Sequence, residues 1–438
     1  MRSMRALAVA FLLAACGDNL PPRGEFEIVG HHDLGAKGMW SAIAAVDGYV
    51  YVGSRNDQKG IQIVDVSDPS APAIVGEVGP PNEGIPGMSS RELRIVPSRN
   101  LLIVLNLRCS PDLHGCNGAG EGENLKFYDI SDRRAPVLLS SYLVAGTMFR
   151  PRSPHEFFVW TDDTRVLVYV TAPPSSPSLE VIDATDPTAP VRLAAWDPGM
   201  AGLMKNPGGD DILHSISISD DGTRAYLSHQ QSGLLVADVS ALPEITLVTP
   251  SDKALTWEPA LTMGPHSAVP MKGRDVLVVT EEIYPMPFGT GCPWGHLHVV
   301  DMADPTALVE VGEFALPEND PAYCATPRPN ITYTAHNVTT TQDLALVTWY
   351  AGGLQAIDIS DPTNPRQLAE LRPEPLPSVT VEDPALGGAP IEMWSYPIIK
   401  DGSIYVVDAR NGLYVLSYHG YGAEQIAHTS FREGNSNL

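Results

Sequence analysis

Short runs of apolar and β-branched residues recur along the chain, and glycine, proline or aspartate residues bound most of them. Runs of this length predict β-strands, because a helix needs a longer segment in which apolar residues recur every three or four positions. Clear examples are residues 61–65 (IQIVD), 124–129 (NLKFYD) and 354–358 (LQAID). The pattern therefore predicts an all-β protein.

These runs belong to a repeated unit, in which a strand ends in aspartate and a turn of the type S-D-P-x-x-P leads into a second strand. Proline continues neither a strand nor a helix, since it lacks an N–H donor and restricts the residue before it. The strand-ending residues, spaced 54 to 64 positions apart, are Asp65, Asp129, Asp183, Asp238, Asp301, Asp358 and, in a truncated seventh copy, Ser417. The aspartates expected to hold the turns through their own backbone are Asp68, Asp132, Asp186, Asp304 and Asp361.

Two further apolar runs precede each unit, so each copy holds four strands. Seven such copies predict a seven-bladed β-propeller with four-stranded blades over residues 26–420. The seventh copy ends after three strands, near Tyr418, whereas residues 26–34 (FEIVGHHDL) form a strand with no predecessor. We therefore expect the N-terminal strand to close the last blade, which leaves no open sheet edge there. Residues 421–438 are polar and are expected to form a loose tail.

The segments IQIVDVSDP (61–69) and LQAIDISDPTNP (354–365) resemble the motif of the LVIVD-repeat family, and the resemblance covers most of residues 26–420. It implies a bacterial exported propeller of a family whose members mostly lack an assigned activity. The architecture is also similar, more distantly, to the selenium-binding protein/methanethiol oxidase family, in which histidines line the channel.

Residues 1–15 read as a signal peptide, with Arg2 and Arg5 before an apolar run that is too short to span a membrane. The sequence Leu-Ala-Ala-Cys ending at Cys16 resembles the bacterial lipobox, which implies cleavage before Cys16 and lipidation of its sulfur. Residues 16–25 are then a lipidated tether, and Gly17 favours the outer membrane of the bacterial cell envelope. The alternative is an ordinary signal peptide with a chance cysteine.

The chain carries 28 basic and 52 acidic residues, a formal net charge of −24. This charge argues against nucleic acid and anionic membrane surfaces as partners, since both attract basic patches. The lipid anchor at Cys16 makes the membrane an expected partner in spite of this charge. The other expected partner is an unknown small-molecule or protein ligand. The propeller itself is expected to be a monomer.

Four cysteines follow Cys16, and an even number in an exported chain favours disulfides. The expected pairs are Cys109–Cys116 and Cys292–Cys324. A zinc site formed by Cys109, His114 and Cys116 is an alternative, although the spacing fits no common structural zinc pattern.

The first strand of each propeller blade lines the central channel, so equivalent positions in different blades converge. That column contains four histidines, which are His155, His214, His266 and His336. The ends of the second strands add His229 and Glu281, with Glu282 next in sequence. Neutral imidazoles and a carboxylate suit a divalent transition metal such as Zn, Cu, Fe or Mn, which makes these seven residues candidate metal ligands.

Two alternatives stay open for the histidine column. Duplication copies packing roles too, so each histidine could simply hydrogen-bond the backbone of a neighbouring blade. General-base catalysis is the other alternative. No nucleophile elbow, phosphate loop or dinucleotide fingerprint is present, so catalytic residues stay unknown. The leading hypothesis is an envelope-anchored propeller lipoprotein acting as a ligand-binding or protein-interaction module. The competing hypothesis is a metal-dependent enzyme, such as an oxidoreductase, with a His/Glu site at the central channel.

Overall fold

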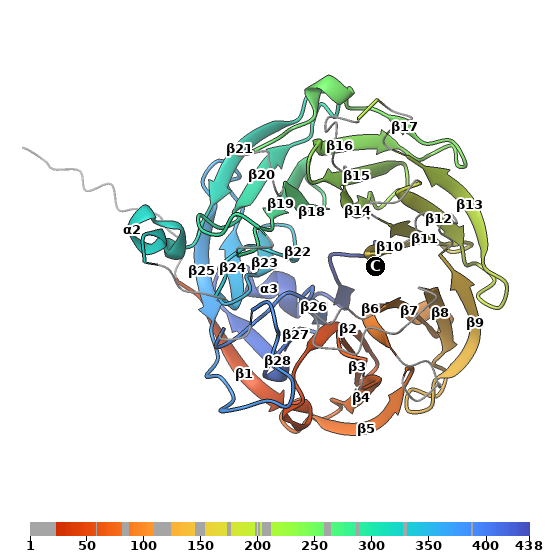
Figure 1. The fold of residues 1–438 in the computed structure, drawn as a ribbon, viewed down its shortest axis with the longest axis vertical. Helices are drawn as coiled ribbons and strands as arrows, with labels where there is room; N and C mark the ends of the chain where they lie inside the picture. The colour runs from red at the N-terminus through yellow and green to blue at the C-terminus, as the bar shows by residue number, and fades with distance from the viewer. Residues whose placement is uncertain are drawn as a thin grey trace, which may run out of the picture.

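The computed structural model describes residues 23–57, 59–80, 87–108, 124–144, 154–172, 177–197, 199, 202–203, 212–257, 264–285, 289–326, 331–386 and 389–438. Within these ranges the fold is built almost entirely from antiparallel β-sheets arranged in a ring (Figure 1). This is the all-β, propeller-like architecture that the repeats predict.

In the four-stranded sheets, strands that are consecutive in the sequence lie next to one another, in order from the ring centre to its rim (Figure 1). Four separate sheets of four strands are β10 (Glu156–Thr161) to β13 (Val191–Trp196), β14 (Leu213–Ile218) to β17 (Thr246–Leu247), β18 (Pro265–Pro270) to β21 (Val309–Phe314), and β22 (Val338–Thr340) to β25 (Arg366–Leu371). Their middle strands are β11 (Val166–Thr171), β12 (Leu179–Asp183), β15 (Arg224–His229), β16 (Gly233–Asp238), β19 (Val276–Glu281), β20 (Leu297–Asp301), β23 (Leu344–Thr348) and β24 (Leu354–Asp358).

An eight-stranded sheet consists of two further four-strand sets that share a single pairing, between Ser54 and Ser90. The first set is β2 (Trp40–Val46), β3 (Tyr49–Ser54), β4 (Ile61–Asp65) and β5 (Ala73–Val78). The second set is β6 (Met88–Val96), β7 (Leu101–Arg108), β8 (Asn124–Asp129) and β9 (Val137–Leu143).

The remaining sheet joins the two ends of the chain. Strand β1 (Glu25–His32) pairs with β28 (Gly412–His419), which is followed inwards by β27 (Ser403–Asp408) and β26 (Ile398–Lys400). The register runs from Glu25 opposite His419 to His32 opposite Leu413. The prediction that an N-terminal strand completes the last repeat is therefore confirmed.

The hydrophobic core lies between neighbouring sheets rather than in one central mass. One cluster joins β10–β13 to β14–β16, and another joins β23–β25 to β26–β28. A third cluster packs the first set of strands against the last sheet, with Trp40 and Val415 both fully buried. Each sheet is thus covered on both faces by its neighbours, which is why the strands read as continuous apolar runs.

The prediction that Asp68 and its counterparts hold the turns is confirmed, and the strand-ending aspartates accept a similar hydrogen bond that was not predicted. Asp65 accepts a hydrogen bond from the backbone N–H of Ser67 at 3.0 Å, and Asp68 accepts one from the N–H of Ser70 at 3.0 Å. The same pair of contacts recurs in other copies, for example at Asp358 and Asp361. Short polar side chains that bond two residues ahead favour tight turns over continued strands.

The expectation of a loose C-terminal tail is wrong. Helix α3 (Ala423–Ala427) is followed by β29 (Phe431–Arg432), which pairs with β26, and Ser436 then forms a parallel bridge with Val159 of β10. Figure 1 places the C-terminus near the ring centre. The segment is polar because the backbone groups of the innermost strands are its partners, so polarity here does not signal solvent exposure.

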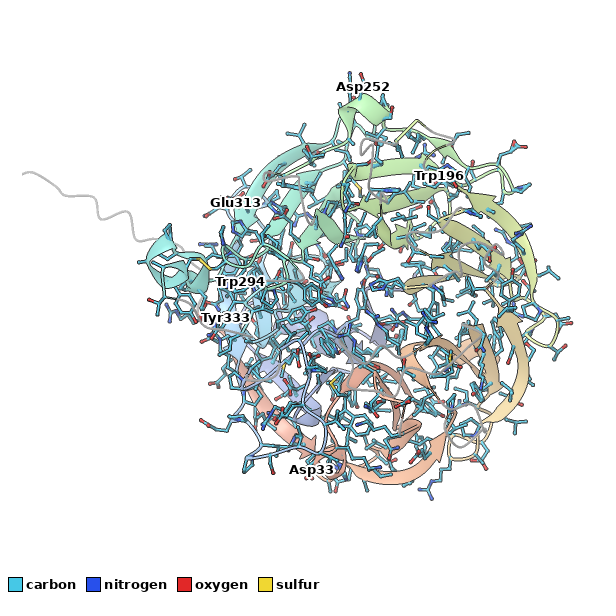
Figure 2. All side chains as sticks on the ribbon, viewed as in Figure 1. Asp33, Trp196, Asp252, Trp294, Glu313 and Tyr333 are labelled. Carbon is cyan, nitrogen blue, oxygen red and sulfur yellow. A yellow bond between two sulfur atoms is a disulfide. The ribbon has the colours of Figure 1, made fainter. Side chains whose placement is uncertain are left out.

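One of the two expected disulfides lies in the described part of the chain. Cys292 and Cys324 are bonded, and Cys324 ends the short helix α2 (Pro321–Cys324) at the ring periphery, near the labelled Trp294 and Tyr333 (Figure 2). Cys16, Cys109 and Cys116 lie outside the described residues, as do the signal peptide and most of the tether. None of the described helices has the length and hydrophobicity needed to cross a bilayer.

Candidate functional site: a histidine and carboxylate cluster at the ring centre

Four histidines from four different sheets lie side by side at the innermost strands. His155 precedes β10, His214 and His266 lie in β14 and β18, and His336 precedes β22. The ring centroids of successive histidines are 4.1, 4.1 and 4.0 Å apart. The repeat positions these side chains, because each lies at the start of the innermost strand of its sheet.

Glu282 is the carboxylate on which three of these histidines converge. Its oxygens lie 3.1 Å from Nε2 of His336, 3.6 Å from Nε2 of His266 and 3.8 Å from Nε2 of His214. Four ligands of a tetrahedral ion at about 2.05 Å are separated by roughly 3.3 Å from one another. The observed separations bracket that value, and the ligand atoms of His214, His266 and Glu282 all lie within 4.8 Å of one another.

Hydrogen bonds at the opposite ring nitrogens orient two of the imidazoles. Nδ1 of His336 lies 2.5 Å from the carbonyl oxygen of Trp394, which can only accept, so Nδ1 carries a proton. Nδ1 of His214 lies 3.0 Å from the hydroxyl of Ser215. Nδ1 of His266 has no hydrogen-bond partner among the described residues.

Burial and mutual proximity set the charges of the cluster. Burial, together with neighbouring basic groups, lowers the pKa of His155 and His214 well below the usual value and that of His266 to about 4. Burial alone would raise the pKa of Glu282, but the imidazoles of His336, His266 and His214 bring it well below its usual range. The cluster therefore combines an ionised Glu282 with the imidazoles of His155, His214 and His266, which burial keeps neutral, and metal binding requires both of these protonation states.

Two tyrosines extend this cluster. The hydroxyl of Tyr350 donates a hydrogen bond to Glu282 and lies 3.1 Å from the hydroxyl of Tyr284. Burial and the negative charge of Glu282 raise the pKa of Tyr350 well above its usual value, so the phenol stays protonated. Tyr350 also has a φ of 45°, an uncommon backbone conformation for a non-glycine residue that often marks functional sites.

Tyr350 is a site residue that the sequence reasoning missed. Glu282 follows the last residue of β19, Arg55 follows the last residue of β3, and Tyr350 lies two positions beyond the end of β23. Arg55 is buried, with its guanidinium 3.8 Å from the ring centroid of Trp394. Comparing the residues just beyond the second strand of each repeat could have revealed this second column.

Glu281 and His229 were also predicted as metal ligands, but the structure places them elsewhere. Successive residues of a strand point to opposite faces, and Glu281 contacts Nε2 of His298 at 3.1 Å, whereas Glu282 faces the cluster. His229 packs edge-on against Trp196, with ring centroids 5.9 Å apart.

His298 forms a second, separate cluster that sequence reasoning did not find. Its Nδ1 lies 2.8 Å from Glu310, its Nε2 contacts Glu281, and its ring stacks on Trp257 with centroids 4.4 Å apart. Burial lowers the pKa of His298, but hydrogen bonds to the two carboxylates outweigh it, so the pKa is raised. Although Glu313 adds another carboxylate nearby, both nitrogens of His298 are already paired, and the geometry fits an imidazolium between two carboxylates.

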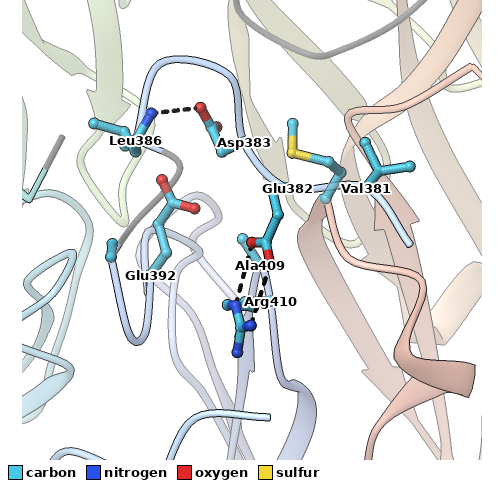
Figure 3. Close-up of a pocket in the computed structure, with 9 residues that line it drawn as sticks. Val381, Glu382, Asp383, Leu386, Glu392, Ala409 and Arg410 are labelled. Carbon is cyan, nitrogen blue, oxygen red and sulfur yellow. Dashed lines mark hydrogen bonds and ion pairs between the residues drawn. The ribbon is translucent and has the colours of Figure 1, made fainter. Parts of the chain in front are cut away.

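A small pocket is lined by several acidic groups, among them Glu382, Asp383 and Glu392 (Figure 3). Arg410 forms an ion pair with Glu382 at 3.2 Å, and Asp383 accepts a hydrogen bond from the N–H of Leu386 at 2.8 Å. Burial and the neighbouring Asp383 raise the pKa of Glu392 well above its usual value. A protonated Glu392 makes this pocket a less suitable cation site than the histidine cluster.

The comparisons with known proteins identify the repeats. The family described as LVIVD repeat matches residues 37–79, 292–315 and 334–369. The chain carries LVIVD repeats. These repeats belong to a β-propeller repeat family, in agreement with the resemblance seen in the sequence. The sequence matches no curated protein significantly.

Solved structures resemble the LVIVD-repeat chain in fold. Raptor from Chaetomium thermophilum aligns with a TM-score of 0.53 and 12% identity over 91% of this chain, which spans only 29% of that protein. A periplasmic gluconolactonase from Pseudomonas aeruginosa aligns with a TM-score of 0.49 and 12% identity, over 73% of this chain and 80% of its own. Sqt1 from Saccharomyces cerevisiae aligns with a TM-score of 0.49 and 8% identity over 91% of this chain and all (100%) of its own. The likeness to the selenium-binding protein/methanethiol oxidase family stays a prediction.

Proposed function

We propose that this protein is a seven-bladed propeller lipoprotein that binds a divalent transition metal at its centre. The observation that carries the proposal is the approach of three Nε2 atoms, from His214, His266 and His336, to within 3.1–3.8 Å of the carboxylate of Glu282. The four residues come from three neighbouring sheets, so those sheets must pack against one another to assemble the cluster.

The electrostatics of the cluster favour a cation over a purely structural role. Burial keeps His214 and His266 neutral, and a neutral imidazole that carries its proton on Nδ1 directs a lone pair from Nε2. A lone pair that His214 directs at the ionised Glu282 is repulsive at 3.8 Å. A metal ion placed between these atoms turns this repulsive pair into a pair of metal–ligand contacts.

The donor set narrows the class of metal. Three imidazoles and one carboxylate suit Zn, Cu, Fe or Mn, whereas Ca and Mg prefer all-oxygen sites. His155, whose ring centroid lies 4.1 Å from that of His214, lies beside this donor set.

Metal-dependent catalysis, for example by an oxidoreductase, is the second candidate function. The observation in its favour is the protonated phenol of Tyr350, which donates to Glu282 and lies 5.1 Å from the ring centroid of His336. Such a phenol can give a proton to a group bound at the metal. The buried guanidinium of Arg55 nearby favours an anionic ligand.

The N-terminal sequence supports a location of the protein in the cell envelope. Cleavage before Cys16 and lipidation of its sulfur would anchor the propeller to the outer membrane of a bacterial cell envelope. We expect the anchored protein to be a monomer and to bind a small-molecule or protein ligand. Replacing Cys16 by serine should abolish incorporation of labelled palmitate and release the protein from membranes. Retention of label in that variant would contradict the anchor.

Elemental analysis tests the metal site directly. Protein purified without chelators, or reconstituted with Zn, Cu, Fe or Mn, should hold about one metal ion per chain. The variant His266→Ala should lose that metal, whereas His428→Ala, at an exposed position far along the chain, should retain it. The absence of stoichiometric metal from the wild-type protein after reconstitution with all four ions would overturn the proposal.

A further inference from the structure

The C-terminal segment contacts β10, the strand that begins directly after His155. The side-chain amide of Asn435 donates to Oε1 of Glu156 at 2.6 Å, and the backbone carbonyl oxygen of Asn435 accepts from the N–H of Val159 at 3.1 Å. Asn437 brackets Thr161, accepting from its N–H at 2.9 Å and donating to its carbonyl at 2.8 Å. The end of the chain is thus bound along β10, the innermost strand that begins next to His155.

Glu156 uses both of its carboxylate oxygens in this buried position. Oε1 accepts from Asn435 and lies 3.9 Å from the guanidinium of Arg94, while Oε2 accepts the hydroxyl proton of Ser215. Glu156 is only 5% exposed, so water supplies little competition for these donors.

The hydroxyl of Ser215 links Glu156 to His214 of the histidine cluster. A hydroxyl has a single proton, and Ser215 donates it to Oε2 of Glu156, so that proton is committed. The oxygen of Ser215 must then accept from Nδ1 of His214, which lies 3.0 Å away. His214 is therefore held with its proton on Nδ1 and with the lone pair of Nε2 facing Glu282.

We propose that the C-terminal tail positions a metal ligand, through the relay Asn435–Glu156–Ser215–His214. The inference rests on the proposed metal site and adds a role for residues that lie far from it in sequence. Asn435 and Glu156 are positioning residues, because they act on the metal only through the tautomer and orientation of His214. Groups of this kind commonly contribute 10- to 100-fold to metal affinity.

Two asparagines of the tail provide a matched pair of variants. Asn435→Ala removes a contact to the relay, whereas Asn437→Ala removes contacts to the backbone of Thr161 alone. Both weaken the docking of the tail, so a merely structural role predicts the same effect on Co²⁺ binding. We expect N435A to lower the Co²⁺ affinity about 10-fold or more and to alter the cobalt d–d spectrum, and N437A to leave both near those of the wild type.

Glu156→Gln tests the tautomer itself. A glutamine has one acceptor and one donor group, so it cannot accept from both Asn435 and Ser215. In metal-free protein with labelled histidine, ¹⁵N NMR should report an Nδ1–H tautomer for His214 and a shift towards Nε2–H in E156Q. Cobalt binding that N435A and N437A change equally, or an unchanged tautomer in E156Q, would overturn the inference alone. Absence of cobalt binding by the wild type would overturn the proposed function and this inference with it.

Discussion

The carboxylate of Glu282 lies 3.1 Å from Nε2 of His336, although the two residues belong to neighbouring sheets. Nδ1 of the same imidazole is bound to the carbonyl of Trp394, in a third part of the ring. His336 is thus fixed on one side by backbone and presented on the other to a carboxylate that also faces His214 and His266. Rigid convergence from separate sheets is what distinguishes this site from a local ligand motif.

Replacing either of two neighbouring glutamates should distinguish a loss of metal binding from a general effect on the fold. Glu282→Gln should weaken the binding of Zn²⁺ or Co²⁺ by roughly 100-fold, because a charged ligand becomes neutral. Glu281→Gln changes the next residue, which contacts His298 instead, and should leave the metal affinity within about threefold. Isothermal titration calorimetry of the metal-free protein measures the metal affinity of both variants. Equal losses of affinity in the two variants would contradict the conclusion that Glu282, and not Glu281, faces the histidines.

Removal of the C-terminal tail should cost stability. Deleting residues 431–438 removes β29 and the hydrogen bonds of Asn435 and Asn437 from the ring centre, and it leaves buried partners such as Glu156 unsatisfied. Each buried group left unpaired costs about 1–3 kcal/mol, so a loss of several kcal/mol in the free energy of unfolding is expected. Deleting Leu438 alone is the control and should change stability little. Urea denaturation that does not distinguish the two truncations would contradict the docked tail.

Glu433 should make stability depend on pH. Burial, opposed by Arg94, raises the pKa of this fully buried carboxyl to about 7, whereas the unfolded value is about 4.3. The folded state then holds a proton that the unfolded state has lost, so stability falls as the pH rises from about 4 to 7. Glu433→Gln should remove this slope and be more stable at pH 8 by up to about 4 kcal/mol. Urea denaturation of both proteins at pH 5 and pH 8 measures whether the free energy of unfolding falls with rising pH in the wild type and not in the variant.

His298 should respond to pH in a related way. Its pKa is raised by hydrogen bonds to Glu281 and Glu310, so its contribution to stability is complete below the unfolded value of about 6.5. That contribution is lost as the pH rises through the folded pKa. In Glu310→Gln the pKa of His298 should fall, because one of the two anionic partners is gone. An NMR titration of the His298 ring measures this, and an unchanged pKa would contradict the charged triad.

Much of the fold could be predicted from the sequence because the repeat is local. Asp65 and Asp68 form turns with residues two positions ahead, and the missing fourth strand of the last copy identifies β1 as its partner. The histidine column was visible for the same reason, since His214, His266 and His336 occupy one position of the repeat. Glu282 and Tyr350 were harder to place, because they lie just beyond strand ends, where the backbone leaves the regular register.

The strands, the turns, the closing strand and the histidine column could all be predicted from the sequence, since each depends on spacing within a repeat. The folded structure was needed to show that Glu282 rather than Glu281 faces the histidines, because the choice depends on which face of the strand end points to the ring centre. It alone also decided that the polar tail is buried. Asn435 finds Glu156 across 279 positions of the chain, and a contact of that range leaves no local pattern to recognise.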